Sequence, residues 1–127
     1  MRKIYFLIAA NFAATLLFAS LAAASDVMRS SVWSIKLQKE LRHELCQPKD
    51  YTRFCYNLDQ EKCETVIEKF TADCIPKLGM PDRVEIFGNG VKLAYRVGSC
   101  VAKKVDFKFA DQRSPASKCK NAQEWMQ

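Results

Sequence analysis

The chain has 127 residues and a formal net charge of +6, and 49% of its residues are hydrophobic. This length accommodates one domain with a modest core, and it excludes division into several large domains. Internal repeats, low-complexity tracts and linkers are also missing from the sequence.

The first residues have the pattern of a secretory signal peptide. Arg2 and Lys3 precede a nearly continuous apolar run over residues 4–21, which ends in small residues before Ala24. A basic start, an apolar run and a small-residue cleavage site predict that residues 1–24 are removed by signal peptidase. An uncleaved membrane anchor is the alternative, because the run is almost long enough to cross a bilayer.

Cleavage after Ala24 leaves residues 25–127 as a single exported domain, periplasmic or secreted. Its 18 basic and 14 acidic side chains give it a net charge of +4. The first cysteine is Cys46, too far from the apolar run for a lipid anchor.

The six cysteines all lie in this exported part, which predicts a framework of three disulfides in an oxidising compartment. They are Cys46, Cys55, Cys63, Cys74, Cys100 and Cys119. A zinc site is the alternative, but zinc sites pair ligands roughly two to four residues apart. Here the closest cysteines are Cys55 and Cys63, and His43 is the one histidine. We therefore expect no metal and no cofactor.

Two amphipathic helices are predicted in the first half of the chain. Apolar residues from Trp33 to Leu45 recur at every fourth position and predict a first helix over residues 26–46, capped by Ser25 or Asp26. After a short turn that begins near Asp50, Asp59 is expected to cap a second helix over residues 60–75. Its apolar face is formed by Cys63, Val66, Ile67, Phe70 and Cys74. We expect the two helices to pack as an antiparallel pair.

The second helix limits the disulfide pairing. Cys63 and Cys74 are about three turns, roughly 16 Å, apart along it, and a disulfide allows Cα atoms only about 6 Å apart. They cannot be bonded to each other. The proximity of Cys46 to Cys55 favours a bridge between those two, with Cys63 and Cys74 divided between Cys100 and Cys119.

Residues 83–109 alternate between apolar and polar side chains, which predicts a small antiparallel sheet. Gly88-Asn89-Gly90 is then a hairpin turn. The alternative is an all-α fold with residues 91–109 helical, but this helix would bring Lys104 and Lys108 into its apolar stripe. Ser114-Pro115 predicts the start of a short C-terminal helix. The expected fold class is therefore α+β.

Catalysis has little support in the sequence, and we expect a protein that is not an enzyme. His43 stands alone on the polar side of the first helix, where a histidine is usually only solvated. Nucleophile-elbow and phosphate-loop motifs are missing from the sequence. A carboxylate-based wall hydrolase is the one enzyme class that leaves no local motif.

The positive charge is concentrated in residues 92–127, which hold 8 basic and 3 acidic side chains. On strands, one face would carry Lys92, Arg96, Lys104 and Lys108. That face could bind an acidic surface or anionic lipid, and nucleic acid is the weakest candidate because exposed aromatic residues are not interleaved with the lysines. A solvated face that maintains solubility is the simpler alternative.

The expected function is that of a small, non-enzymatic, exported binding protein, which contacts an envelope or extracellular protein. An inhibitor, an immunity protein or a secretion accessory protein would have these features. The alternative is a cationic secreted effector that binds membrane, lipopolysaccharide or an acidic polymer through its basic C-terminal part.

Overall fold

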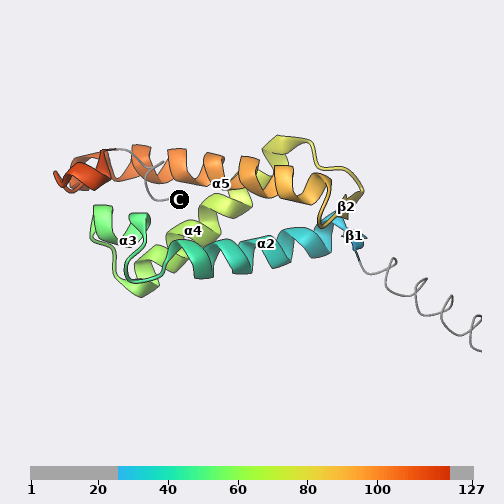
Figure 1. Ribbon diagram of the computed structural model, residues 1–127, viewed down its shortest axis with the longest axis horizontal. Coiled ribbons are helices and arrows are strands. Elements are labelled where there is room, and N and C mark those ends of the chain that lie inside the picture. Colours follow the sequence, from blue (N-terminus) through green and yellow to red (C-terminus); the bar gives the residue numbers. More distant parts are fainter. Residues whose placement is uncertain (1–25, 121–127) are drawn as a thin grey trace, which may run out of the picture.

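Three long helices form the body of the protein in the computed structural model, which describes residues 26–120 (Figure 1). They are α2 (Ser30–Leu45), α4 (Gln60–Cys74) and α5 (Asn89–Lys108). α4 packs against both α2 and α5. As Figure 1 shows, α2 and α5 run in the same direction and α4 runs against them between the two.

Short elements connect the long helices. Between α2 and α4 lies α3 (Tyr51–Tyr56), and a two-stranded antiparallel sheet joins β1 (Val27–Arg29) to β2 (Arg83–Glu85), with Met28 opposite Val84. Three 3-10 turns complete the described part of the chain: η1 (Ile75–Leu78), η2 (Ala110–Gln112) and η3 (Ser117–Cys119). The sheet holds the starts of α2 and α5 together at one end of the molecule.

The central helix α4 forms where its sequence pattern predicts it. Asp59 caps its N-terminus, since its carboxylate accepts a 2.7 Å hydrogen bond from the backbone amide of Lys62. Cys63, Ile67 and Cys74 are fully buried along one face. Burial of this apolar face against α2 and α5 supplies most of the free energy that stabilises the helix.

The first helix begins later than the sequence indicates. Residues 27–29 are not helical but pair with β2, and the backbone amide of Ile86 donates to the Asp26 carbonyl at 2.8 Å. α2 starts at Ser30, whose amide donates to the Asp82 carbonyl at 3.1 Å. Pairing with a distant strand therefore replaces the local cap that Ser25 or Asp26 was expected to provide.

The predicted sheet over residues 83–109 is wrong beyond residue 85, and the alternative that residues 91–109 are helical holds for residues 91–108. α5 occupies most of that segment, with Leu93, Val97, Val101 and Val105 buried at every fourth position. Gly88-Asn89-Gly90 is not a hairpin turn but the start of this helix. The period-two pattern predicted strands only because Val91, Tyr95 and Phe107 were assigned to the core, whereas all three are exposed.

The structure shows how the helix accommodates the two lysines in its apolar stripe. The ammonium groups of Lys104 and Lys108 lie 5.4 and 5.8 Å from the centre of the Phe70 ring on α4. Their alkyl stems can cover apolar surface while the charged ends reach the ring face and solvent. A lysine at the edge of an apolar stripe is therefore compatible with a packed helix.

The disulfides join Cys46 to Cys63, Cys55 to Cys119 and Cys74 to Cys100. The predicted participation of all six cysteines is confirmed, as is the conclusion that Cys63 and Cys74 bond elsewhere. The favoured Cys46–Cys55 bridge is wrong, and Cys63 reaches neither Cys100 nor Cys119. The antiparallel packing of α2 on α4 places Cys46 within 5.8 Å of Cys63, measured between Cα atoms, and the pairing follows from that approach.

The predicted C-terminal helix is present only as the 3-10 turn η3 within the described residues. Its continuation over residues 121–127 lies outside them, as do the predicted signal peptide and its cleavage site. Among residues 26–120, no helix is both long and apolar enough to cross a membrane.

Two glycines of α5 should respond oppositely to alanine. A Cβ at Gly90 would lie 2.7 Å from the Glu85 carbonyl oxygen and 3.3 Å from Trp33 Nε1, whereas a Cβ at Gly98 meets nothing within 4 Å. We expect Gly90→Ala to lower the free energy of unfolding by about 1–3 kcal/mol through overpacking. Gly98→Ala should raise it by up to about 1 kcal/mol through better helix propensity. Urea denaturation measures both, and equal effects of the two substitutions would contradict the packing described.

Candidate functional site

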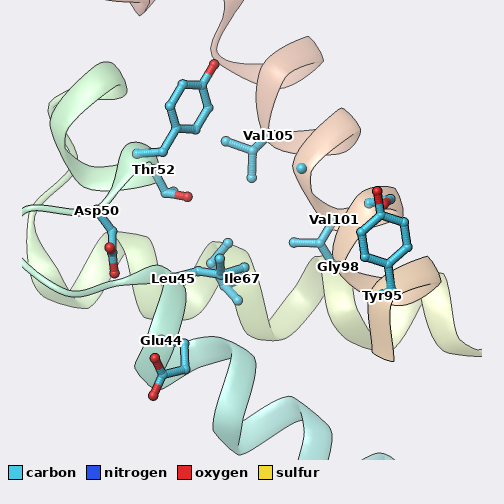
Figure 2. A pocket seen from close by; sticks show the side chains of 12 residues that line it. Glu44, Leu45, Asp50, Thr52, Ile67, Tyr95, Gly98, Val101 and Val105 are labelled. Atoms are coloured by element: carbon cyan, nitrogen blue, oxygen red, sulfur yellow. The ribbon is translucent and has the colours of Figure 1, made fainter. Parts of the chain in front are cut away.

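An apolar groove lies between α2 and α5. The section of it next to α3 has a volume of about 290 Å³. Figure 2 shows Glu44 and Asp50 on the side of α2 and α3, Tyr95 and Val101 on the side of α5, and Ile67 of α4 between them. The lining is Glu44, Leu45, Asp50, Tyr51, Thr52, Ile67, Tyr95, Gly98, Ser99, Val101, Ala102 and Val105.

The groove exists because α2 and α5 both pack on α4 and have only limited contact with each other. Ile67 lies on the α4 surface between them and forms the floor, together with Val101 and Val105 of α5. These floor residues are almost completely buried. A ligand or partner would therefore contact mainly the walls and the rim, above a rigid apolar base.

The α5 wall is formed by small and apolar residues. Val91, Tyr95, Gly98 and Ala102 follow one another at spacings of four, three and four residues, which places them on one strip of the helix. Val91 and Tyr95 are 59% and 67% exposed. Small residues at Gly98 and Ala102 leave room for another backbone to approach α5 closely.

The α2 wall carries charge along its rim. Glu44 and Asp50 line the section next to α3, and Lys36 and Glu40 line a second hollow of about 250 Å³ nearer the start of α2. The second hollow is floored by apolar residues that include Trp33, Leu37 and Ala94. Because the two hollows lie one after the other between the same pair of helices, they extend the groove along α2. Its rim is net acidic.

A polar cluster positions α3 at the end of the groove. The buried Tyr56 hydroxyl donates a short hydrogen bond to Asp106 of α5 and accepts one from Arg113 at 2.8 Å. The Tyr51 hydroxyl lies 3.4 Å from the same Asp106 carboxylate. The Cys55–Cys119 disulfide ties α3 to the C-terminal segment at the same place. Side chains from three parts of the chain therefore hold this wall of the groove.

The cluster changes the titration of Tyr56. Burial, followed by the hydrogen bond to Asp106, raises the pKa of the Tyr56 phenol well above its usual value of about 10. The hydrogen bond with Tyr56 also raises the pKa of Arg113. Both shifts favour the protonated forms, so at neutral pH Tyr56 is a neutral phenol beside an ion pair of Arg113 and Asp106. Its role is structural rather than nucleophilic, because a phenolate is the reactive form.

The basic residues predicted as one face are separated by the helix. Lys92 and Lys108 are 16 residues apart, which turns them by about 160° around α5. Lys92 and Arg96 point to solvent, whereas Lys104 and Lys108 bend over Phe70 on α4, and Lys104 lies 3.5 Å from Asp73. Helical spacing instead places Lys92, Arg96 and Lys103 on a common outward strip.

His43 lies on the exposed side of α2, with its ring 3.3 Å from Glu44. Its described hydrogen-bond partners are Glu44 and Gln47, and neither is a nucleophile of the serine or cysteine type. Within residues 26–120, no group of three potential metal ligands comes together.

Comparison of the chain with profiles of protein families, with curated proteins and with solved structures found no match.

The groove residues were not singled out from the sequence. A usable signal exists in the strip from Val91 to Ala102, where uncharged residues follow helical spacing on the side away from the core. That signal becomes visible only once residues 91–109 are assigned to a helix. The α2 rim gives no such signal, because Glu40 and Glu44 look like any solvated helix face.

The raised pKa of Tyr56 predicts that the folded protein loses stability at alkaline pH. Because the folded state favours the protonated phenol, its contribution to stability is fully present below about pH 10 and is lost as the pH rises further. We expect the free energy of unfolding to fall as the pH rises above about 10, and Tyr56→Phe to make this dependence on pH less steep. Tyr95→Phe, at an exposed tyrosine, is the matched control. The same slope in wild type and Tyr56→Phe would contradict the assignment.

Proposed function

We propose that the protein is an exported, non-enzymatic binding protein whose α2–α5 groove receives an apolar helix of a partner protein. The proposal rests mainly on the groove, which is apolar and has small residues on one wall and acidic residues on the rim of the other. Grooves between helices commonly bind amphipathic helices through anchors at helical spacing.

Export is supported by two independent features. The predicted signal peptide over residues 1–24 directs the chain out of the cytoplasm. Three disulfides with no free cysteine among the described residues are typical of proteins that fold in an oxidising compartment.

A protein partner is favoured over a small ligand by the shape of the site. Its floor residues Ile67, Val101 and Val105 are already almost fully buried, so a compact ligand seated on the floor would gain little contact with them. Its exposed apolar area lies instead on the walls, at Val91 and Tyr95. Tyrosine is one of the residues enriched at the centres of protein interfaces.

The charge of the rim specifies the kind of helix. Glu40, Glu44 and Asp50 outnumber Lys36 along the α2–α3 side. On the α5 side no charged residue lines the groove, because Lys92 and Arg96 lie on the outward strip of the helix. A partner helix with an apolar face and basic residues on one flank is complementary to this arrangement. Opposite charges at the rim would govern orientation and association rate more than affinity.

Photo-crosslinking in the producing cells tests the groove. A photoreactive phenylalanine analogue at Tyr95 should yield a discrete protein adduct, whereas the analogue at Ile35 should not. Ile35 is the matched control because it is 70% exposed, close to the 67% of Tyr95, but is absent from the groove lining. Mass spectrometry of the adduct should find an apolar segment with basic residues.

Reversal of the rim charges separates binding from folding. Glu40→Lys with Glu44→Lys should reduce the Tyr95 adduct by about tenfold or more, since two like charges then face the basic flank. Lys39→Glu, an exposed change on α2 outside the groove, should leave it unchanged. Equal adducts at Tyr95 and Ile35, or an adduct that survives rim reversal, would show that the groove is not the binding site.

Processing and disulfide formation are tested on the secreted material. We expect intact-mass and N-terminal analysis of exported protein to give a start at Ser25 and no free thiols. Peptide mapping should recover the Cys46–Cys63, Cys55–Cys119 and Cys74–Cys100 pairs. Protein retained in the cytoplasm with reduced cysteines would contradict the proposed export.

A further inference from the structure

An exposed phenylalanine near the end of α5 is surrounded by lysines. Phe107 is 88% exposed, the highest value among the large hydrophobic side chains of the described residues. It lines a shallow hollow with Phe70, Lys103, Lys104 and Lys108. We call the surface formed by these five residues the lysine–phenylalanine face.

The lysines are arranged around aromatic rings rather than neutralised by carboxylates. Lys104 and Lys108 lie over the Phe70 ring, and Lys108 and Lys62 each lie 5.8 Å from the centre of the Phe109 ring. Among the ion pairs of the described residues, one reaches this face, between Lys104 and Asp73 at 3.5 Å. Cation–π contacts orient ammonium groups without cancelling their charge, so the face stays strongly positive.

Further positive charge lies on the same side of α5. Arg96 precedes Lys103 by seven residues, and Lys92 precedes Arg96 by four, so helical geometry places all three on one outward strip. The strip leads to Phe107, which lies four residues after Lys103. The exposed apolar ring therefore stands at the end of a basic strip, between flanking lysines.

We propose that the lysine–phenylalanine face binds the surface of an anionic lipid bilayer, with Phe107 inserted among the head groups. A bilayer surface offers phosphate groups and, just below them, the boundary of the acyl chains. The lysines can bind the phosphates while the exposed aromatic ring enters that boundary. A soluble polyanion would gain from the lysines but not from Phe107. Nucleic acid would need several stacking aromatics, and this face exposes one.

The membrane surface and the groove are compatible on one molecule. Phe107 follows Ala102 by five residues, so the two point about 140° apart around the axis of α5. A protein resting on a bilayer through Phe107 would keep the groove facing away from the lipid. This inference does not depend on what the groove binds, and its test uses no protein partner.

Vesicle sedimentation with the oxidised mature protein tests the proposal. Vesicles of phosphatidylglycerol mixed with phosphatidylcholine should bind the protein, and vesicles of phosphatidylcholine alone should not. Phe107→Ala should weaken binding by about tenfold, the cost of withholding one large apolar side chain. Phe87→Ala is the matched control, because Phe87 is 81% exposed and lies about 30 Å away, before the start of α5.

Charge substitutions complete the experiment. Lys103→Gln and Lys108→Gln should each weaken binding on the order of fivefold, and Lys39→Gln on α2 should leave it unchanged. Circular dichroism checks that each variant is folded, and Phe107 and Lys103 are both exposed, so their substitution removes little packing. Insensitivity to Phe107→Ala overturns the proposal, because it leaves only non-specific adsorption. Binding of the wild type to soluble polyphosphate that is as tight as to vesicles overturns it as well.

Discussion

The packing of α4 between α2 and α5 is the constraint on which the rest of the structure depends. Ile67 and Phe70 contact the neighbouring helices, and disulfides fasten α4 at both ends, through Cys63 to Cys46 and through Cys74 to Cys100. Each bridge is worth roughly 2–4 kcal/mol in a domain whose core is too small to be very stable alone. With α4 fixed on both sides, α2 and α5 cannot close on each other, and the groove between them persists without a ligand.

The same arrangement divides α5 into three strips with different surroundings. One strip, from Leu93 to Val105, is buried against α4 and the rest of the core. A second, from Val91 to Ala102, forms the uncharged wall of the groove, and a third carries the basic residues that end at Phe107. A helix presents all three at once because its side chains radiate in every direction, whereas a strand would offer only two faces. The helix in place of the predicted sheet therefore changes the functional interpretation as well as the fold.

Opposite charges predominate among the residues that line the groove and on the outer side of α5. Acidic residues gather on the α2–α3 rim, at Glu40, Glu44 and Asp50, and basic residues gather on the outside of α5. This separation gives the proposed partner helix and the proposed lipid surface opposite charge requirements, so neither would compete for the other's site. It also means that salt should weaken lipid binding steeply and the apolar groove contact less.

The sequence by itself determined the features that depend on local chemistry: the capped central helix after Asp59, the engagement of every cysteine in a disulfide, and the impossibility of a bridge between Cys63 and Cys74. The tertiary structure decided the rest. Residues 91–109 satisfy both a period of two and a period near four, and only the apolar face of α4, reached through Cys74–Cys100, selects the helix. The pairing of Cys46 with Cys63 and the late start of α2 at Ser30 likewise depend on contacts between segments far apart in the chain. The groove could not be predicted because its walls come from three helices, and its shape arises from how they diverge over Ile67.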